Sequence, residues 1–556
     1  MSVAKSSTTQ IPLAPVPSIL EATTRSCPDR PALDFLGRKT SYAELSRLVD
    51  QAAKGFQQLG VKKGTRVGLC LPNSPYFVVC YYAILKAGGV VVNFNPLYVE
   101  RELKHQIEDS GTTIMVTLDI RQIYPKVAAM LDATSSLERI VVCSMSGILT
   151  AVKSVMFQVF KRSEIADIPD DLNHVSFERL IANDGKPKPV EIDPINDLAV
   201  LQYTGGTTGV PKGAMLTHGN LSANTEQLRR WCPGMLLGQE RMLLVLPLFH
   251  VFAMTVGMNL GIAFGAELIL LPRFEMDQVL KTITKKRPSL FPGVPTIYTA
   301  LNNAAENGPW DLSSIKICIS GGAPLPIEVR ARFEELTGCS LVEGYGLSES
   351  SPVATCNPIG GVAKAGSVGI PMGDTRIEIR SPADPAILME QGEKGEVCIR
   401  GPQVMAGYWK RPADTEAVMH DGALRTGDIG YLDEDGYLFL VDRIKDVIIS
   451  GGYNIYPRVI EEALYQHPDV AEVVVIGIPD QYRGQAPKAF VRLKEGHQAT
   501  PDQLKEFLGG YLSRVEMPKL IELRKELPKT MVGKLSKKEL VAEEAAKGSP
   551  DLPKAS

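Results

Sequence analysis

The sequence predicts an α/β protein with a large N-terminal domain of layered, mostly parallel sheets and helices, followed by a small mobile α+β C-terminal lid domain. Three observations carry this prediction. With 556 residues, of which 44% are hydrophobic and 22% charged, the chain is long enough for more than one globular domain. Short β-branched runs alternate with helical patterns through its first part, and a compact α+β pattern fills its last hundred residues.

The first part of the chain contains four short strand-like runs with helical segments between them. The runs begin at Arg66, Gly89, Thr113 and Arg139 and read RVGLCL, GVVVNF, TIMVT and RIVVC. The intervening segments SPYFVVCYYAILKAG and YVERELKHQIEDSG have helical periodicity and end in small or turn residues. Such alternation is typical of parallel sheets covered by helices.

A domain boundary is expected near Arg443. The segment DEDGYLFLVD before it predicts a hairpin with Gly436 at its turn. Beyond it, PRVIEEALYQH predicts a helix, VAEVVVIGI and KAFVRLKEG predict strands, and PDQLKEFLGGYL predicts a second helix. We therefore expect an N-terminal domain at 1–442, a hinge at 443–446 and a lid domain at 447–556. A joint this short favours rigid-body rotation of the lid.

Charge and cysteine usage exclude several classes of protein. The 60 basic and 63 acidic residues give no strong field, so no nucleic-acid partner is expected. The nine cysteines are irregularly spaced and form no CxxC pair, which excludes a zinc pattern and a disulfide framework. The N-terminal twenty residues lack an apolar run typical of a signal peptide. These features predict a cytoplasmic protein.

Two apolar segments raise the question of membrane contact. Hydropathy alone would allow a span from Met242 to Ala266, but the polar residues within it and Glu267 directly behind it favour a buried core segment. In the stretch 148–162, apolar residues recur on one helical face with Lys153, Lys161 and Arg162 at its edges and end. This helix either rests in a membrane interface, on the inner face of the membrane, or packs on the core as an ordinary surface helix.

A glycine- and threonine-rich loop, YTGGTTGVPKGA, follows the apolar run LAVLQ and begins at Tyr203. Its glycines let the backbone bend closely around an anion and present N–H groups, and its hydroxyls and lysine add donors and positive charge. The spacing differs from that of a Walker A loop, GxxxxGK[ST]. We expect polyphosphate binding by Thr204, Gly205, Gly206, Thr207, Thr208, Gly209 and Lys212.

With this loop, three further segments resemble the adenylate-forming enzymes, a family that includes acyl-CoA synthetases, luciferases and peptide-synthetase adenylation domains. The segments are EGYGLSES (343–350), RTGDIGYLDEDGYLFLVDRIKDVIISGGYNIYP (425–457) and PKTMVGKLSKKEL (528–540). The motifs occur in order from about residue 41 to residue 540. Among subgroups, the chain is most similar to bacterial long-chain fatty acyl-CoA ligases.

The resemblance implies an ATP or AMP site with magnesium. Tyr345, between two glycines, can lie flat on a purine, and Glu349 offers a hard oxygen ligand to Mg²⁺. Asp428 can accept both ribose hydroxyls, and Arg443 can reach the same sugar or the α-phosphate. Outside the loop, the nucleotide residues implied by the resemblance are Gly322, Ala323, Glu343, Gly344, Tyr345, Gly346, Ser348, Asp428, Arg443 and Lys534.

Lys534 is the predicted catalytic cation of the first step, assisted by Thr207, Lys212 and Glu349. Attack of a carboxylate on the α-phosphate brings two anions together, and a cation that touches both stabilises the transition state. The alternative is an exposed lysine in a basic tail, because Lys529, Lys537 and Lys538 are close by in the sequence. Gly533 and the family register favour the catalytic role.

For the second step, the resemblance implies rotation about Lys445, so that the loop from Ser450 to Pro457 replaces Lys534. Gly451 and Gly452, with Tyr453, would then line the tunnel for coenzyme A. His250 in PLFHVF is either a buried core histidine or the gate of the acyl pocket. An amino-acid substrate is disfavoured, because relatives that activate amino acids carry an aspartate after this phenylalanine.

The sequence therefore predicts a ligase that joins a fatty acid to coenzyme A, with ATP and CoA as co-substrates and Mg²⁺ as cofactor. The acyl pocket is expected near Met242–Ala266 and near Val294. Alternatives are an aryl-acid CoA ligase, a fatty acyl-AMP ligase that loads a carrier protein, and a nonenzymatic binding protein on a decayed ligase. Whether the chain forms a homodimer is left open.

Overall fold

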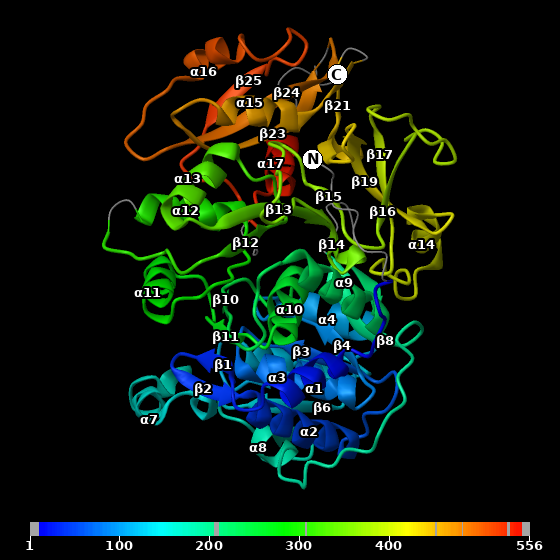
Figure 1. The fold of residues 1–556 in the computed structure, drawn as a ribbon, viewed down its shortest axis with the longest axis vertical. Helices are drawn as coiled ribbons and strands as arrows, with labels where there is room; N and C mark the ends of the chain where they lie inside the picture. Colours follow the sequence, from blue (N-terminus) through cyan, green and yellow to red (C-terminus); the bar gives the residue numbers. More distant parts are fainter. Residues whose placement is uncertain are drawn as a thin grey trace, which may run out of the picture.

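The computed structural model describes residues 10–204, 211–305, 308–450, 453–480, 482–530 and 534–547. Sheets and helices form a large lobe, and a smaller α+β lobe closes over one end of it (Figure 1). The described helices of the large lobe are α1 Pro17–Ser26, α2 Tyr42–Gln58, α3 Pro75–Lys86, α4 Glu100–Ser110, α5 Tyr124–Ala128, α6 Met130–Ala133, α7 Ala151–Phe160, α8 Phe177–Leu180, α9 His218–Trp231, α10 Leu260–Ala263, α11 Met276–Lys286, α12 Pro295–Ala305, α13 Ile327–Thr337 and α14 Pro412–Val418.

The first sheet has seven strands in the order β7-β6-β5-β3-β4-β8-β9, all parallel except the last pair. Its middle strands are buried on both faces, which explains their continuous β-branched runs. The four predicted strands of the first part are confirmed as β3, β4, β5 and β6. The strands are β3 Arg66–Cys70, β4 Val90–Asn93, β5 Ile114–Leu118, β6 Arg139–Cys143, β7 His174–Ser176, β8 Leu198–Thr204 and β9 Lys212–Thr217.

Helix α3 covers this sheet and shows why an almost wholly apolar segment is helical. Ser74 caps its N-terminus by accepting a hydrogen bond from the N–H of Phe77, and Pro75 occupies the first turn. Residues 76–85 are all buried, because α3 also packs against α2 and α1. The predicted helices of the first part are confirmed as α3 and α4.

The second and third sheets run along the other side of the large lobe. One has the order β10-β11-β1-β2, and the next, β12-β13-β14-β15, carries the segment around Tyr345. Their strands are β1 Pro31–Phe35, β2 Arg38–Ser41, β10 Arg241–Leu244, β11 Glu267–Leu270, β12 Ile317–Ser320, β13 Ser340–Gly346, β14 Val353–Cys356 and β15 Ile370–Pro371.

A five-stranded antiparallel sheet completes the large lobe. Strands β19 and β20 form the predicted hairpin, with Gly436 at φ +80° in its turn. Asp428 of β19 stands opposite Arg443 of β20 in this register. The strands are β16 Arg376–Arg380, β17 Gly395–Arg400, β18 Met419–His420, β19 Ala423–Leu432 and β20 Leu438–Arg443.

The small lobe has its own sheet and its own cores. The buried cluster of the large lobe extends to Leu438, whereas the clusters of the small lobe begin at Ile448. The 3₁₀ turn Ile444–Asp446 between them contains no buried residue. The elements of this lobe are β21 Ile448–Ser450, β22 Tyr453–Ile455, α15 Pro457–Tyr465, β23 Val470–Asp480, β24 Gly484–Leu493, α16 Pro501–Leu508, β25 Leu520–Leu523 and α17 Lys537–Lys547.

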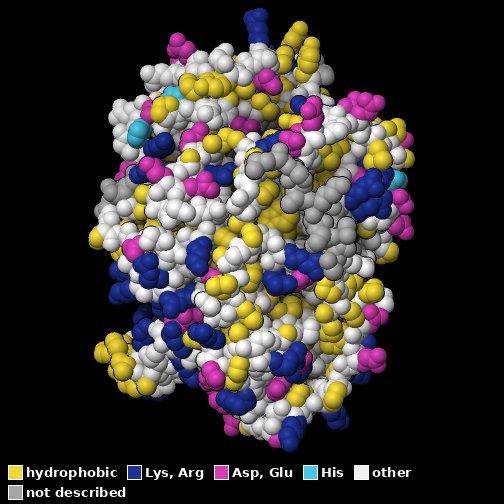
Figure 2. Space-filling model, viewed as in Figure 1, with side chains coloured by type: hydrophobic (Ala, Val, Ile, Leu, Met, Phe, Trp, Pro, Cys, Tyr) yellow, Lys and Arg dark blue, Asp and Glu magenta, His cyan; other side chains and the backbone are white. Residues whose placement is uncertain are grey.

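Helix α7 confirms the helical prediction for the stretch 148–162 but turns its apolar face outward. Ile148 and Leu149, before the helix, are buried, whereas α7 itself has no buried residue. Only Phe157 packs partly on the core. The ordinary alternative, in which the predicted apolar face packs on the core, is therefore wrong. Hydrophobic side chains gather at the lower left of Figure 2, where Figure 1 shows α7.

All nine cysteines are free and buried, as their irregular spacing predicted for a chain without a disulfide framework. The segment from Met242 to Ala266 is buried within the large lobe as β10, the π-helix η3 (Ala253–Asn259) and α10. No helix in the described part of the chain is long and apolar enough to cross a bilayer.

Candidate functional site

A carboxylate, a phenol and a guanidinium meet at the edge of the large lobe. Asp428 is buried, and Nε of Arg443 lies 3.0 Å from its Oδ1. The phenol of Tyr345, at the end of β13, donates a hydrogen bond of 2.6 Å to Oδ2 of Asp428. Burial and the adjacent carboxylate raise the pKa of Tyr345 well above its ordinary range, so the phenol remains a donor. Three of the predicted nucleotide residues thus lie together.

Lys534 reaches this group from the small lobe. A Cβ atom added to Gly322 would lie 3.0 Å from Nζ of Lys534, so the lysine lies against this glycine. The φ of Gly322 is +87°, in the region that favours glycine. Burial and the nearby charge of Arg443 lower the pKa of Lys534 to about 8, and Asp428 partly opposes this. The lysine is therefore a half-buried cation at the meeting of the two lobes. The alternative of an exposed lysine in a basic tail is wrong.

Glu343 also faces the small lobe. Its strand, β13, lies parallel to β12, with Glu343 beside Ser320. Burial raises the pKa of Glu343 to about 7, although the positive charge of Arg458 on α15 lowers it. The carboxyl group is therefore close to half-protonated at neutral pH.

The backbone around Tyr345 is closely packed. A Cβ added to Gly346 would collide with the carbonyl oxygen of Pro352. The absence of a side chain at Gly346 therefore lets β13 lie tightly against the following segment. Gly344 pairs with Cys356 of β14, and Ser348 begins the 3₁₀ turn that carries Glu349. Ala323, next to Gly322, is half-buried.

Glu349 belongs to a second polar group that the sequence analysis did not identify. The phenol of Tyr408 donates a hydrogen bond of 2.7 Å to Oε1 of Glu349. Nζ of Lys212 lies 5.3 Å from the centre of the Tyr408 ring and 2.5 Å from Oδ1 of Asp414. Tyr408 and Asp414 are thus new candidate site residues. The sequence offered no signal for them beyond an aromatic residue after a glycine.

The predicted phosphate loop is only partly within the described residues. Thr204 and Lys212 pair across the β8–β9 hairpin, and Oγ1 of Thr204 donates a hydrogen bond of 3.4 Å to the carbonyl oxygen of Lys212. The hairpin therefore brings the two ends of the loop together beside Tyr408. Gly205, Gly206, Thr207, Thr208 and Gly209 lie outside the described residues.

The joint between the lobes is held by a residue that the sequence analysis did not single out. The carboxylate of Asp442 accepts hydrogen bonds of 2.8 Å from the N–H groups of Arg443, the first residue of the joint, and of Arg458, beyond it. Burial raises the pKa of Asp442. Lys445, in the 3₁₀ turn, has a pKa lowered by burial and by the charge of Arg443.

Tyr453, predicted for coenzyme A, lies on the β21–β22 hairpin. Its side chain is 61% exposed, whereas Lys534 of the same lobe faces the nucleotide residues. Gly451 and Gly452 lie outside the described residues.

His250 is half-buried just before η3. Its Nδ1 accepts a hydrogen bond of 3.3 Å from the N–H of Phe252. Burial and the nearby charge of Lys534 lower the pKa of His250 to about 3, so the imidazole is neutral at physiological pH. It therefore stands next to the half-buried Lys534 and just before η3 within the apolar segment.

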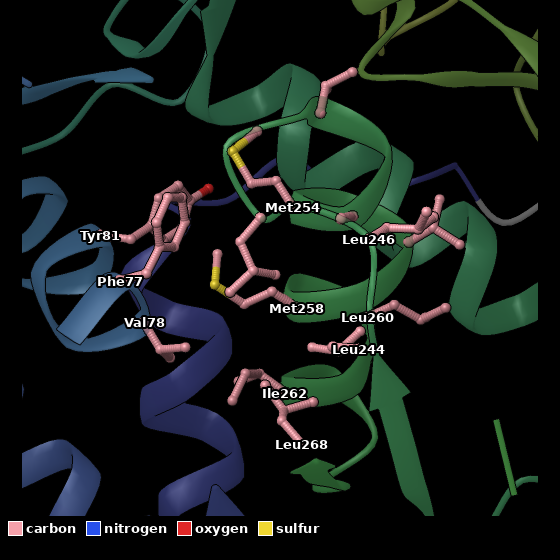
Figure 3. Close-up of a cluster of buried hydrophobic side chains, with 14 of the residues drawn as sticks. Phe77, Val78, Tyr81, Leu244, Leu246, Met254, Met258, Leu260, Ile262 and Leu268 are labelled. Atoms are coloured by element: carbon pink, nitrogen blue, oxygen red, sulfur yellow. The ribbon is translucent and has the colours of Figure 1, made fainter. Parts of the chain in front are cut away.

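The apolar segment behind His250 packs on its two sides against different elements (Figure 3). Met254 and Met258 of η3 point toward Phe77, Val78 and Tyr81 of α3. On the other side, a Cβ on Gly257 would lie 2.6 Å from Leu244, so this glycine lets η3 approach β10. The segment combines flexible methionine side chains with a π-helix, a form often found at functional sites.

A magnesium ligand can be judged by its donor chemistry. The structure shows no group of three or more potential His, Cys, Asp or Glu ligands in its described part. Glu349 supplies one hard carboxylate next to Tyr408, whereas the carboxylate of Asp414 is paired with Lys212. This fits Mg²⁺ that is bound mainly by substrate phosphates, which needs only one or two carboxylates from the protein.

Comparison with family models matches two stretches of the chain. The model described as AMP-binding enzyme matches residues 20–409, and that described as AMP-binding enzyme C-terminal domain matches residues 459–534.

Comparison with individual proteins gives matches over nearly the whole chain. A long-chain-fatty-acid–CoA ligase of Bacillus subtilis is 44% identical over 96% of this chain and 95% of its own length. The ligase of the same name from Yersinia pestis is 38% identical over 94% of this chain and 93% of its own length. Among solved structures, the anthranilate CoA ligase AuaEII in complex with anthranoyl-AMP superposes with a TM-score of 0.84 at 25% identity, covering 97% and 98%. ATP-bound MatB from Rhodopseudomonas palustris superposes with a TM-score of 0.81 at 27% sequence identity, covering 97% of this chain and 99% of its own.

Proposed function

Because the chain belongs to the family of AMP-binding enzymes, we propose that it joins a long-chain fatty acid to coenzyme A through an acyl-adenylate. The observation that carries the proposal is the convergence of Lys534 from one lobe with Tyr345, Asp428 and Arg443 from the other. The long-chain substrate class is that of relatives 38–44% identical over most of their length.

In the first step, a carboxylate oxygen of the fatty acid attacks the α-phosphorus of ATP. The bond from this phosphorus to the bridging oxygen breaks, and pyrophosphate leaves with the electron pair. Lys534 stabilises the two anions as they approach, and Arg443 contacts the α-phosphate or the ribose. Tyr345 stacks on the purine, and Asp428 exchanges its hydrogen bond from Tyr345 for the ribose hydroxyls.

The β8–β9 loop holds the phosphates. Thr204, Thr207 and Lys212 contribute donors and charge, together with the backbone N–H groups of the intervening residues. Glu349 would hold Mg²⁺, with Tyr408 fixing the carboxylate through its hydrogen bond. Bound there, the metal supplies positive charge to the phosphates.

In the second step, the thiolate of coenzyme A attacks the acyl carbonyl carbon. The bond between this carbon and the phosphate oxygen breaks, and AMP leaves. The thiolate needs its own approach, so we propose that the lobe at 447–556 rotates about the joint at 443–446, with Lys445 at the hinge. Gly451, Gly452 and Tyr453 would then line the path of the thiol.

We place the fatty acyl chain along η3, behind His250. A neutral imidazole beside Lys534 can turn aside without desolvating a charge, which suits a gate. Most side chains around η3 are aliphatic, aromatic or methionine, with Thr255, Asn259 and Asn93 as polar exceptions, and the apolar majority favours an alkyl chain over a polar acid.

A second candidate is a ligase for aryl acids. A feruloyl-CoA synthase of Amycolatopsis is 36% identical over 93% of this chain. A fatty acyl-AMP ligase that loads a carrier protein would use the same first step. The cytoplasmic location and a homodimer stay predictions.

Two assays test the proposal. Pyrophosphate exchange should depend on a fatty acid and should fall by about a thousandfold in Lys534→Ala, since one transition-state contact is lost. Exchange that is unchanged in this variant would remove the assigned role of Lys534. Mass spectrometry of products, with fatty acid, ferulate, coenzyme A and carrier protein offered together, should show fatty acyl-CoA. Feruloyl-CoA or acyl carrier protein as the main product would favour an alternative.

A further inference from the structure

The outward face of α7 is an unusual surface for a folded domain. Five apolar side chains at helical spacing are 53–75% exposed: Val152, Val155, Met156, Val159 and Phe160. We call this set the apolar helix face. It belongs to an ordered element, because Nζ of Lys153 donates a hydrogen bond of 2.6 Å to the carbonyl oxygen of Leu36, and Phe157 packs on the core.

A positively charged surface continues from this helix. The guanidinium of Arg38 on β2 hydrogen-bonds the carbonyl oxygens of Gly147 and Leu149, just before α7. From β2, the sheet order β2-β1-β11-β10 leads to Arg241, whose Nη1 donates a hydrogen bond of 2.7 Å to the carbonyl oxygen of Lys286 at the end of α11. We call the resulting set the basic face: Arg38, Lys39, Arg241, Lys281, Lys285 and Lys286.

The charge balance of the basic face differs from that of the whole chain. The carboxylates among these six basic residues are Asp34, Glu267, Glu275 and Asp277; the first two are buried, and Glu275 is paired with Arg273. Asp34 is paired with Lys286, and Glu267 with Lys39 and Arg241. The face is therefore positive, although the chain has a formal net charge of −3. Figure 2 shows Lys and Arg side chains directly beside the apolar group at the lower left.

We propose that α7 and the basic face together dock the protein on an anionic lipid bilayer. In this arrangement the apolar helix face enters the boundary between headgroups and acyl chains, and the lysines and arginines contact lipid phosphates. The charge complementarity favours a bilayer over an apolar protein groove, because Arg162 continues the positive charge at the end of α7, beside a Lys161 that is paired with Glu164. Given the proposed function, docking would bring the enzyme to fatty acid dissolved in the membrane.

Cosedimentation of the full chain with vesicles tests the proposal. Vesicles of equimolar phosphatidylcholine and phosphatidylglycerol should pellet the protein, and added salt should weaken this binding. The variant Val152→Glu with Val155→Glu should lose about tenfold or more in partitioning. A matched control is Val362→Glu with Ile195→Glu, because the exposed fractions are similar. They are 71% for Val152 and 61% for Val155, against 72% for Val362 and 63% for Ile195.

The basic face has its own variant. Lys281→Gln with Lys285→Gln should weaken binding to the anionic vesicles but not to phosphatidylcholine alone. The same change of charge on the small lobe, Lys494→Gln with Lys525→Gln, should leave vesicle binding unchanged. Equal pelleting of the α7 variant and its control would overturn the proposal. So would a loss of self-association in the α7 variant without a loss of vesicle binding, which would make a second copy the occupant.

The docking result is separable from the ligase result. Octanoate is soluble in water, so acyl-CoA formation from it should be the same in the wild type and in the α7 variant. With palmitate supplied from anionic vesicles, the variant should be slower. An inactive wild type that still binds vesicles would reject the proposed function and leave the docking proposal standing. An active wild type that binds no vesicles would reject the docking proposal and leave the proposed function standing.

Discussion

Lys534 combines two properties that a surface lysine does not have. It is half-buried against residues of the other lobe, and its pKa is lowered to about 8. The first-step role needs the protonated form, because only a cation stabilises two approaching anions. Its ionisation state therefore changes within the ordinary range of assay pH.

This pKa predicts the pH dependence of adenylation. Below about pH 8 the ammonium form dominates, and above it kcat/KM for pyrophosphate exchange should fall about tenfold per pH unit. In Lys534→Arg the rate should be lower, because a guanidinium has a different shape, but the profile should be flat over the same range. A wild-type profile that is flat above pH 8 would contradict this assignment.

Glu343 gives a prediction about stability. Its pKa of about 7 in the folded protein lies above its ordinary value of 4.5. Its stabilising contribution is therefore present below about pH 4.5 and is lost as the pH rises through about 7. Glu343→Gln is neutral at every pH, so its Tm should exceed that of the wild type by a few degrees at pH 8.

The difference in Tm should disappear at pH 5, where the wild-type carboxyl group is mostly protonated. Glu434→Gln, at an exposed position, is the matched control and should not alter Tm at either pH. A Glu343→Gln variant that is less stable than the wild type at pH 8 would show that the charge of Arg458 outweighs burial.

The sequence predicted Asp428, Arg443, Tyr345 and Lys534 as site residues because each lies in a compact motif. Tyr408 and Asp414 were missed for a physical reason. Their contacts with Glu349 and Lys212 cross between segments far apart in the chain, and no local spacing encodes such a contact.

At the scale of elements, hydrophobic periodicity predicted which segments are helices or strands, but not what covers them. The strands β3 to β6 are buried on both faces, so their apolar runs had one interpretation. The apolar face of α7 had two interpretations. Amphipathicity shows that one side of a helix is apolar, but it does not show whether that side packs on the core. The π-helix η3 was not predicted, since its geometry depends on how closely Gly257 lets it approach β10.

The packing of η3 predicts a change of acyl specificity. Met258 is fully buried, and Met258→Ala should reduce stability by about 2–5 kcal/mol through the cavity that it leaves. The same space should admit a longer acid, so the optimum in a panel of acids of increasing length should move upward.

Met372→Ala is the matched control, because Met372 is also buried in the core of the large lobe but lies outside the η3 segment. It should cost similar stability, measured by urea unfolding, without moving the optimum chain length. The same shift in both variants would place the acyl chain elsewhere.

At the scale of the whole molecule, two lobes with separate cores meet across a four-residue joint. The motif order and the change of secondary-structure pattern near Arg443 predicted a large and a small lobe. The orientation of the lobes was not predictable, because it depends on contacts such as Asp442 with Arg458 and Lys534 with Gly322, which join residues of different lobes.

The joint predicts a separation of the two half-reactions. Lys445→Pro fixes one backbone dihedral angle, so rotation should be hindered while Lys534 stays in the site. Pyrophosphate exchange should be largely retained, and CoA-dependent release of acyl-CoA should fall by about tenfold or more. Lys445→Ala, which keeps the backbone free, should retain both. Equal loss of both half-reactions in the proline variant would argue against a hinge here.

The burial of every native thiol has a practical consequence for following such a rotation. Maleimide dyes react with accessible thiolates, so the wild-type chain should label slowly in its folded state. A single cysteine introduced at exposed Ile449 would then carry a fluorophore on the small lobe without removal of any of the nine natural cysteines. Domain motion could be recorded by fluorescence in an otherwise unaltered enzyme.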